Sequence, residues 1–448
     1  MKAPAGAAYH AEHAWLGGAG APGGRVAAGV LIEVQDGRFA AVRSGVGAPP
    51  PGAVRLAGLV LPGLANVHSH AFHRVLRGRT HGARGSFWTW RDLMYAVADR
   101  LDPDSYHALA RGVFGELALA GVTCVGEFHY LHHGPGGRRY ADPNAMGAAL
   151  TQAAADAGIR LTLLDTLYLT ASVTGQPLAG AQLRFGDGDL DGWSARTAAL
   201  RDTTGVRHGA ALHSVRAVPA QLLTDFAERT AGRPLHVHVS EQQAENVQCL
   251  AEHGCTPTAL LDRHGLLTEH TTVVHATHLT DTDVAALGRA RSAVCLCPTT
   301  ERDLADGIGP GRALATAGCP ITLGTDSHAV IDMFEEARGV ELHERLATQR
   351  RGHFGADELL QAATAAGHTA LGWPDAGTIT VGARADLVAV RLDSARTAGV
   401  DPAGVVFAAS ASDVTHVVAD GRLIVADGRH TGFDVARELA AAIEAVTR

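Results

Sequence analysis

The sequence is almost devoid of lysine. Lys2 is the only lysine among 448 residues, and all other basic side chains are arginines. A mechanism that needs a catalytic lysine, or a lysine that bridges two metal ions, is therefore excluded unless Lys2 at the very terminus supplies it. This exclusion narrows the choice among the metal-dependent enzymes considered below.

Long apolar runs and basic stripes are also missing. No stretch approaches the roughly 18 consecutive apolar residues that a membrane-spanning helix needs. The start of the chain, rich in Ala and Gly, lacks the continuous apolar segment of a secretory signal. The formal net charge of −8, without a basic stripe, gives no reason to expect nucleic acid as a partner. We expect a cytoplasmic protein without membrane or nucleic-acid partners.

The cysteines form no recognisable framework. All six are scattered through a large chain: Cys124, Cys249, Cys255, Cys295, Cys297 and Cys319. Cys295 and Cys297 have strand spacing, but no second cysteine pair accompanies them. Free buried thiols are therefore predicted in preference to a zinc site or disulfide bonds.

The composition is that of a globular protein with a sizeable core. Hydrophobic residues make up 46% and charged residues 19% of the chain. A chain of 448 residues has room for one large barrel or for two to three smaller domains. The 25 histidines are the unusual feature, and their positions carry the functional argument.

Eight apolar, strand-like runs alternate with Ala-rich helical stretches in the middle of the chain. The runs are 58–67, 122–128, 160–169, 206–212, 234–239, 272–274, 293–297 and 321–324. Continuous apolar strands suit a parallel sheet covered on both faces, and eight βα units predict a (β/α)8 barrel over 58–376. A doubly wound open sheet is the alternative. It usually carries a Gly-rich turn after its first strand, where this chain has His68-Ser-His70 instead.

The two ends of the chain resemble each other. Strand and turn signals occupy 26–34, 39–42, 385–390 and 414–425, the last as a hairpin around Asp420-Gly421. We expect segments 1–57 and 377–448 to form one small composite β-sandwich domain. Helical spacing of apolar residues returns only in 433–446.

Histidines and carboxylates lie at the carboxyl ends of nearly every predicted barrel strand, where barrel enzymes place their active sites. They include His68, His70, Glu127, His213, His236, His238, Glu241, His275 and Asp326. Residues two apart in a strand point to the same side, so His68 and His70 can both reach one ion. His236 and His238 share this geometry, and only one of them needs to be a ligand.

Three imidazoles and one carboxylate suit Zn²⁺ or a similar ion and leave room for a water molecule. The ion lowers the pKa of that water toward about 7, and Glu241, three residues after His238, is placed to move protons. Each motif alone has a structural interpretation. His-x-His can be a hydrogen-bonded core pair, Asp326 a helix N-cap, and Glu241 a first-turn glutamate. Their convergence in one barrel favours the metal site.

These motifs resemble the amidohydrolase superfamily over nearly the whole chain. They are LPGLANVHSH (61–70), HVSE (238–241), VH (274–275), GTDS (324–327) and GARADLV (382–388). The resemblance implies a (β/α)8 barrel with a composite β-sandwich. Without a lysine after strand four, the chain is similar to the mononuclear deaminase branch. The branch implies one divalent ion, by default Zn²⁺ but open to iron or manganese.

The same resemblance implies roles for individual residues. His68, His70, His238 and Asp326 would bind the metal, and Glu241 and His275 would join Asp326 in proton transfer. His238 is preferred to His236 because its spacing to Glu241 matches the branch's His-x-x-Glu.

Within this branch the chain most resembles the formimidoylglutamate deiminases. The stretches that carry the likeness are SFWTWRDLMY (86–95), EFHYLHH (127–133), HSVR (213–216), HVSEQQ (238–243) and VHATH (274–278). The resemblance implies that metal-bound hydroxide attacks the formimino carbon of N-formimino-L-glutamate in histidine degradation. The products would be N-formyl-L-glutamate and ammonia. A homodimer is a further expectation from the family.

A dicarboxylate substrate calls for arginine forks and hydroxyl donors. By resemblance, Arg216, His213, Arg91 and Tyr130 would contact the glutamate moiety. Arg91 can also be a surface arginine on a helix over 90–95. His73 stands where the family more often has Gln, so its part in substrate binding stays open.

Two other functions remain open at this point. One is another mononuclear amidohydrolase, such as a guanine or other ring deaminase or an imidazolonepropionase. The other is a non-catalytic scaffold, which would be expected to have lost ligands that are all present here. The crowded EFHYLHH segment is not needed for the metal. We expect His129, His132 and His133 to shape their loop while Tyr130 faces the substrate.

Overall fold

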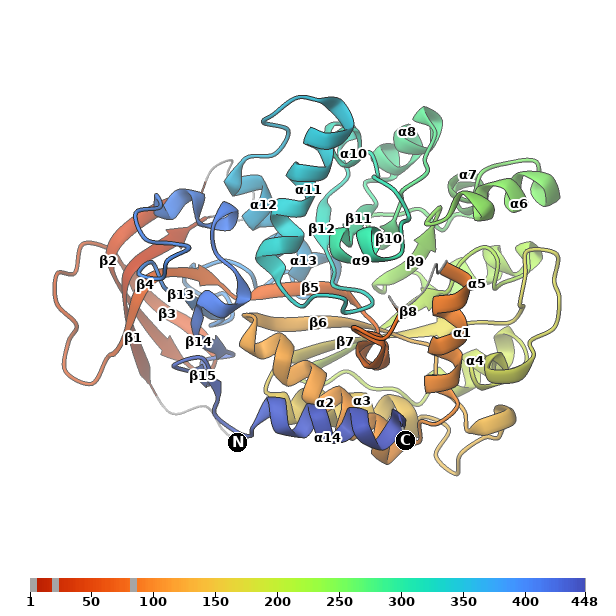
Figure 1. The fold of residues 1–448 in the computed structure, drawn as a ribbon, viewed down its shortest axis with the longest axis horizontal. Coiled ribbons are helices and arrows are strands. Elements are labelled where there is room, and N and C mark those ends of the chain that lie inside the picture. Colours follow the sequence, from red (N-terminus) through yellow and green to blue (C-terminus); the bar gives the residue numbers. More distant parts are fainter. Residues whose placement is uncertain (1–5, 18–23, 81–86, 448) are drawn as a thin grey trace.

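The computed structural model describes residues 6–17, 24–80 and 87–447, so Lys2 and Ser86 lie outside the described residues. Two sheets organise this part of the chain (Figure 1). One is a barrel of eight parallel strands hydrogen-bonded in sequence order. Its strands are β5 (Leu64–Ser69), β6 (Val122–His129), β7 (Arg160–Leu167), β8 (Val206–Leu212), β9 (Leu235–Val239), β10 (Thr271–His275), β11 (Ala293–Leu296) and β12 (Ile321–Leu323).

The barrel closes between its first and last strands. Ser69 and Asp326 form a parallel bridge. The Asp326 amide donates to the His68 carbonyl at 2.9 Å, and the His70 amide donates to the Asp326 carbonyl at 3.1 Å. The predicted (β/α)8 barrel is therefore confirmed. The open sheet that was its alternative is wrong.

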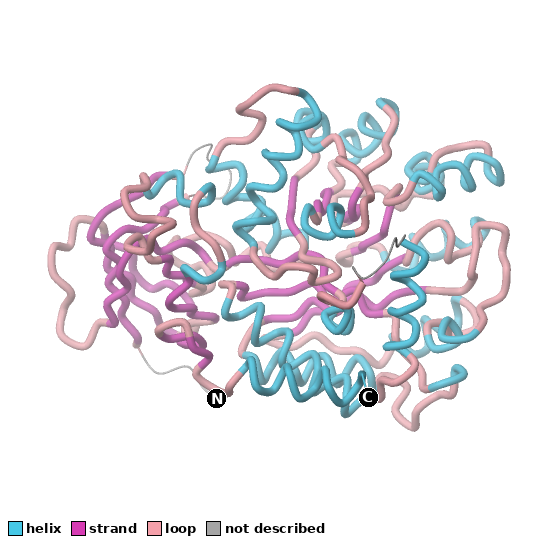
Figure 2. Tube along the Cα trace, viewed as in Figure 1, coloured by secondary structure: helices cyan, strands magenta, loops and turns pink. Residues whose placement is uncertain are grey.

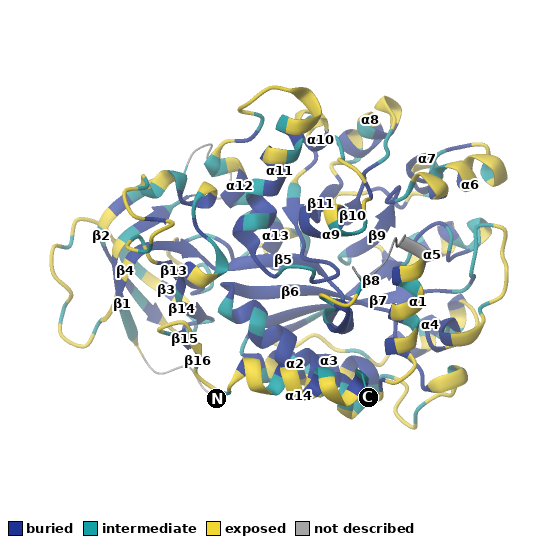
Figure 3. Cartoon of the chain, in the orientation of Figure 1, coloured by how far each residue is buried: buried dark blue, intermediate teal, exposed yellow. Residues whose placement is uncertain are grey.

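Helices surround the barrel on its outer side (Figure 2). Those that follow barrel strands or cover them are α1 (Phe87–Ala98), α2 (Pro103–Leu119), α3 (Ala145–Ala157), α4 (Leu190–Thr197), α5 (Leu223–Thr230), α6 (Gln243–His253), α7 (Pro257–Arg263), α8 (Asp281–Ala290), α9 (Pro298–Asp303), α10 (Gly311–Ala317), α11 (Met333–Thr348), α12 (Ala356–Ala363) and α13 (Ala365–Ala370). Their inner faces and the barrel strands are buried (Figure 3). No helix in the described ranges is both long and apolar enough to cross a membrane.

The second sheet is mixed and joins both ends of the chain, as predicted. Its order is β16-β15-β14-β13-β4-β1-β2-β3. The strands are β1 (Ala7–Leu16), β2 (Arg25–Gln35), β3 (Arg38–Arg43), β4 (Val54–Pro62), β13 (Leu387–Val390), β14 (Val414–Ala419), β15 (Arg422–Ala426) and β16 (Arg429–His430). Strand β1 was not predicted, because its Ala-rich sequence AAYHAEHAWL carries no clear strand signal.

One predicted strand is wrong in its first half. The apolar run 58–67 is not a single barrel strand, because β4 up to Pro62 pairs with β1 and β13 in the mixed sheet. Only β5, from Leu64 onward, enters the barrel. The chain changes sheets at Gly63, where an added Cβ would lie 2.3 Å from the Thr123 hydroxyl. The proposed domain limits 1–57, 58–376 and 377–448 stay predictions.

The terminal helix α14 (Val435–Thr447) packs on the barrel side of the molecule, along α2 (Figure 1). Two glycines of α2 allow the close approach. A Cβ added at Gly112 would lie 3.0 Å from Leu439, and one at Gly115 would lie 2.8 Å from the Phe433 ring. The predicted helix over 433–446 is confirmed, and its contacts belong to the barrel.

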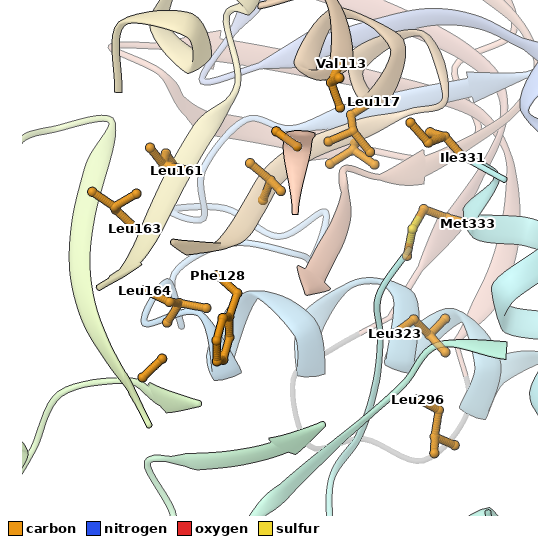
Figure 4. Close-up of a cluster of buried hydrophobic side chains, with 14 of the residues drawn as sticks. Val113, Leu117, Phe128, Leu161, Leu163, Leu164, Leu296, Leu323, Ile331 and Met333 are labelled. Carbon is orange, nitrogen blue, oxygen red and sulfur yellow. The ribbon is translucent and has the colours of Figure 1, made fainter. Parts of the chain in front are cut away.

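The core is continuous between the barrel and its helices. Leucine, valine and phenylalanine side chains from α2, β6, β7, β11 and β12 gather in one buried cluster (Figure 4). The six cysteines are free and buried, as predicted. Apolar burial on this scale is the main favourable term in folding.

A buried ion-pair network joins the barrel to the mixed sheet. Arg160, at the start of β7, is 2% exposed and donates to both carboxylate oxygens of Asp386. Its guanidinium also donates to Asp420 at 2.9 Å. Burial opposes ionisation of Asp386, but Arg160 holds the pKa of that carboxyl below its usual value. The sheets are thus tied through one arginine.

We predict that Arg160→Met lowers the free energy of unfolding by about 3–5 kcal/mol, because it leaves Asp386 buried without its partner. Urea unfolding followed by circular dichroism measures the change. The matched control is Arg43→Met, since the Arg43–Glu33 pair is about half exposed and such pairs contribute about 0–1 kcal/mol. Equal losses in the two variants would contradict the role of Arg160.

The same network carries a pH dependence. Because the pKa of Asp386 is depressed in the folded state, its stabilisation is present above the unfolded value of about 3.9 and is lost as the pH falls through the folded value. The wild-type protein should therefore lose more stability on acidification than an Asp386→Asn variant.

Candidate active site

Four predicted ligands converge where the barrel closes. His68 and His70 come from β5, His238 from β9, and Asp326 from the segment after β12. All four are buried, and one donor atom from each lies within 4.8 Å of the others. Nε2 of His68 lies 3.3 Å from Asp326 Oδ1 and 3.1 Å from Nε2 of His238. His236, the alternative on β9, is not part of this cluster.

Hydrogen bonds on the far sides of two rings orient them toward the centre. Nδ1 of His70 donates to the Phe128 carbonyl at 3.0 Å, and Nδ1 of His238 donates to the His213 carbonyl at 2.9 Å. With its proton on Nδ1, each imidazole presents the lone pair of Nε2 to the centre. Burial lowers the pKa of His68, His70 and His238, which keeps these rings neutral.

Asp326 supplies the negative charge of the cluster. Burial opposes its ionisation, but the hydrogen bond with His68 and the nearby His275 hold the pKa of Asp326 well below its usual range. The residue has a φ of 42°, and Ser240 and His275 at neighbouring strand ends have φ values of 53° and 69°. Left-handed backbone is unfavourable for such residues and tends to cluster at active sites.

Proton-transfer candidates line one side of the cluster. Nε2 of His275 lies 3.8 Å from Glu241 Oε1 and 3.7 Å from Asp326 Oδ2. Burial raises the pKa of Glu241 above its usual value. Burial alone would lower the pKa of His275, but the carboxylates of Glu241, Glu301 and Asp326 raise it well above the usual value. The group can thus hold a proton near the reacting centre.

A hydrogen-bond network lies behind the segment that carries His68 and His70. The Ser69 hydroxyl donates to Glu127 at 2.5 Å, and the Ala71 amide donates to the same carboxylate at 2.7 Å. His328 Nε2 lies 3.0 Å from the Ser69 hydroxyl. Burial raises the pKa of Glu127 to about 8. Glu127 therefore anchors the turn between His68 and η1 (Ala71–Leu76), which follows β5.

The pocket above the cluster contains the predicted substrate-binding residues. Its lining includes His73, Arg91, Tyr130, His213 and Arg216, together with His70, His238, Glu241, His275 and Asp326. Arg91 thus lies on the pocket wall, with its guanidinium 5.5 Å from the Tyr95 ring centre. His73 Nε2 lies 2.9 Å from the Tyr130 hydroxyl. Burial lowers the pKa of His73 to about 3, so a neutral imidazole holds that hydroxyl.

Sequence reasoning missed several members of this site. Tyr95 and Tyr168 line the pocket, and the Gln182 amide donates to both hydroxyls at 3.2 Å. Glu245, on α6, is buried, and its Oε1 lies 3.7 Å from Arg216 Nε. The one available signal was position: Tyr168 follows strand β7 directly, and Glu245 lies one helical turn after Glu241.

Glu301 was also missed. It lies on α9, the helix that begins directly after β11, and its Oε1 is 3.5 Å from Nδ1 of His275. Its Oε1 also accepts the Cys297 amide at 2.8 Å. The Cys297-Pro298 dipeptide predicts a helix start, but not that a glutamate four residues later reaches His275.

Three histidines, His129 at the end of β6 and His132 and His133 in the loop after it, do not join the central cluster. His132 donates from Nε2 to the Thr166 carbonyl at 2.9 Å, and His133 Nε2 lies 3.0 Å from Asp187. His129, His132 and Asp165 could form a second cation site by spacing. However, Arg196 already makes two hydrogen bonds to Asp165, at 2.7 and 2.8 Å. This arginine neutralises the one carboxylate that a cation would need.

The central donor set fits a divalent ion. Three neutral imidazoles and one ionised carboxylate match the ligands of a catalytic transition-metal site. Their Nε2 and carboxylate atoms converge, and two of the rings are locked by backbone carbonyls. When bound, such an ion lowers the pKa of a water molecule and polarises the atom under attack. The residues around it then have to move protons and hold the substrate.

Comparison with known proteins agrees with this architecture. The sequence profile of the Amidohydrolase family matches residues 59–424. A formimidoylglutamate deiminase from Pseudomonas aeruginosa is 38% identical over 425 residues, which cover 90% of this chain and 92% of that protein. An 8-oxoguanine deaminase from the same organism is 30% identical over 435 residues, covering 92% and 93%.

A solved structure has the same fold. The amidohydrolase from Brucella melitensis superposes with a TM-score of 0.88 at 30% identity, covering 99% of this chain and all of that one. Members of this family use a divalent metal, and the relatives named above are deiminases or deaminases, which act on C–N bonds. The His/Asp cluster is placed where such an ion would bind. The chain belongs to the amidohydrolase family.

Proposed function

We propose that the protein is a deiminase that hydrolyses N-formimino-L-glutamate to N-formyl-L-glutamate and ammonia. One observation carries the proposal: two arginines and several hydroxyl groups line the same pocket as a hydrolytic cluster. The arginines are Arg91 and Arg216, and the hydroxyls include those of Tyr130 and Tyr168. Guanidinium groups bind carboxylates in a bidentate manner, so the pocket suits an acyclic dicarboxylate. The relative at 38% identity bears the name of the same activity.

The charges in the pocket favour a substrate that carries a carboxylate over a substrate with a neutral ring. Burial opposes the charge of Arg216, but Glu245 and Glu241 raise the pKa of its guanidinium. Because Glu245 sits on the Nε side of Arg216, the other guanidinium nitrogens remain for a substrate carboxylate. A neutral ring substrate would gain little binding energy from the charged guanidinium of Arg216. Relatives named as ring deaminases nevertheless make that activity the main alternative.

We propose zinc as the ion, because three histidines and an aspartate form its common catalytic donor set. Iron and manganese accept the same ligands. We further propose that the enzyme is a cytoplasmic homodimer that acts in histidine degradation.

Different residues carry out the separate proton-transfer steps. Asp326 takes the proton from the attacking water, while His275 orients that water through Nε2. Glu241, whose pKa is raised by burial, delivers a proton to the formimino nitrogen. As the intermediate collapses to the formyl carbonyl, the nitrogen takes a second proton, the one held by Asp326, and leaves as ammonia, while the hydroxyl proton of the intermediate returns to Glu241. Arg91, Arg216 and Tyr130 hold the glutamate moiety, so that the formimino carbon faces the cluster.

We predict that ammonia release is faster with N-formimino-L-glutamate than with a neutral formimino compound or with 8-oxoguanine. The comparison uses kcat/KM for the same enzyme preparation. The two carboxylates of the preferred substrate should each gain from the arginines, by about 1.5–3 kcal/mol per charged hydrogen-bonded contact. If the neutral compound or the ring were the better substrate, the proposed function would be wrong.

Glu241→Gln should lower kcat by about 10²–10⁴-fold, because general acid–base catalysis typically contributes that much. Metal content, measured by elemental analysis, should stay at the wild-type level, since Glu241 is not among the four converging donors. The control is Glu252→Gln, an exposed glutamate on α6, the helix that follows Glu241, which should leave kcat unchanged. Loss of the metal in Glu241→Gln would contradict a purely proton-transferring role.

Arg216→Met should lower kcat/KM for N-formimino-L-glutamate by about 10- to 100-fold through loss of a charged contact. Turnover of a neutral formimino compound should change far less. Arg289→Met, at a largely exposed arginine, serves as the control. Equal losses with the charged and the neutral substrate would show that Arg216 does not contact a carboxylate.

A further inference from the structure

A second group of potential ligands lies behind the catalytic histidine. Nδ1 of His275, the Cys297 thiol and the Glu301 carboxylate each offer a donor atom, and these atoms lie within 4.8 Å of one another. His275 is 1% exposed, Cys297 is fully buried and Glu301 is 3% exposed. The catalytic side of the same imidazole carries Nε2, which faces Glu241 and Asp326. The two groups of ligands are thus separated by one ring.

The measured distances resemble the edges of a tetrahedral site. Nδ1 of His275 and Oε1 of Glu301 are 3.5 Å apart, and bonds of about 2.0–2.1 Å at a tetrahedral angle give about 3.4 Å. Sγ of Cys297 lies within 4.8 Å of the donor atoms of both His275 and Glu301. The neighbouring Cys295, whose sulfur is 3.9 Å from that of Cys297, does not belong to the converging group, so a water molecule would take the fourth position.

The donors of this group are largely uncommitted. Among the described residues, Nδ1 of His275 has no hydrogen-bond partner that satisfies both distance and angle. The Cys297 thiol has no role in the proposed reaction, and its sulfur contacts only the other thiol at hydrogen-bonding distance. The Cys297 amide holds the Glu301 carboxylate beside that thiol at 2.8 Å. The arrangement is therefore ordered before any ion arrives.

We propose that His275, Cys297 and Glu301 bind a thiophilic divalent cation that inhibits the enzyme. Binding displaces the Cys297 thiol proton and the proton on Nδ1 of His275, and both leave to solvent. One thiolate and one carboxylate then balance the two charges of the ion. A neutral assembly of this kind avoids the cost of a net charge in a buried position.

The inhibition follows from the position of the ring and rests on the proposed proton-transfer role of His275. When Nδ1 is bound by an ion, the ring is held from behind, and Nε2 can no longer move between Glu241 and Asp326. Metal binding does not depend on that role. The two parts of the proposal can therefore be tested separately.

The donor set selects the kind of ion. Thiolate and imidazole ligands favour Zn²⁺ and Cd²⁺, whereas Mg²⁺ and Ca²⁺ prefer oxygen ligands. The catalytic cluster contains no sulfur among its four donors. Ultraviolet charge-transfer absorption from a cadmium–thiolate bond therefore reports on the proposed site and not on the catalytic one.

The test adds Cd²⁺ to the metal-loaded full-length enzyme and removes the excess by gel filtration. We expect one Cd²⁺ per chain in addition to the resident ion, cadmium–thiolate absorption, and at least a 10-fold loss of kcat. Mg²⁺ should cause neither effect. Cys297→Ser should weaken Cd²⁺ binding by about 100-fold or more, because loss of even an outer partner of a metal ligand costs about 10–100-fold. Its activity without Cd²⁺ should equal that of the wild type.

Cys249→Ser is the matched control, because Cys249 is buried and lies near another thiol, Cys255. It should keep the absorption and the inhibition. Glu301→Gln should bind Cd²⁺ more weakly while retaining the thiolate absorption at high Cd²⁺. The proposal is overturned if Cd²⁺ only displaces the resident ion, or if Cys297→Ser binds and responds like the wild type.

The readouts also separate this proposal from the proposed function. Stoichiometry and absorption require no substrate, so they stand whatever compound the enzyme hydrolyses. Inhibition is measured with the best substrate found. Cadmium–thiolate absorption at one ion per chain without loss of kcat would support the site but overturn the inhibitory effect.

Discussion

The closure of the barrel is the constraint on which the rest of the structure depends. The backbone of Asp326 is hydrogen-bonded on both sides to the β5 end, through the carbonyl of His68 and the amide of His70. The same three residues present their side chains to the metal cluster. The bonds that complete the barrel therefore also set the distances among the ligands. A barrel that failed to close would have no metal site.

Arginine supplies the fixed positive charges in a chain with a single lysine. Arg160 ties the barrel to the mixed sheet through Asp386, Arg196 ties α4 to β7 through Asp165, and Arg216 faces the pocket beside Glu245. A guanidinium resists deprotonation on burial and keeps a planar set of donors. The carboxylates are thereby held ionised, or their charge is balanced, without a group that could itself become a base. This leaves any proton transfer to histidine, glutamate and aspartate side chains.

The barrel and the convergence of the four candidate ligands were predictable because both follow local periodicity. Buried parallel strands read as apolar runs, and His68 and His70 share a face through the two-residue repeat of a strand. Apolarity does not say which sheet a strand joins, so the run 58–67 was assigned wrongly. The contacts of Glu301 and Tyr168 depend on how successive crossovers stack, and no spacing in the sequence records that. Most of the candidate residues found from sequence lie at strand ends, whereas Arg91 on α1 and His73 on η1 came from the family resemblance.

The glycine at position 324 explains why two sulfur atoms lie so near the ring of His68. A Cβ at Gly324 would lie 2.8 Å from the His68 Cβ and 3.0 Å from the sulfurs of Cys295 and Cys297. Glycine at this position therefore lets two thiols pack directly under a ligand ring, where burial keeps water out. Burial also raises the pKa of Cys297, which keeps its thiol protonated. The proposed cation would therefore have to displace that proton when it binds.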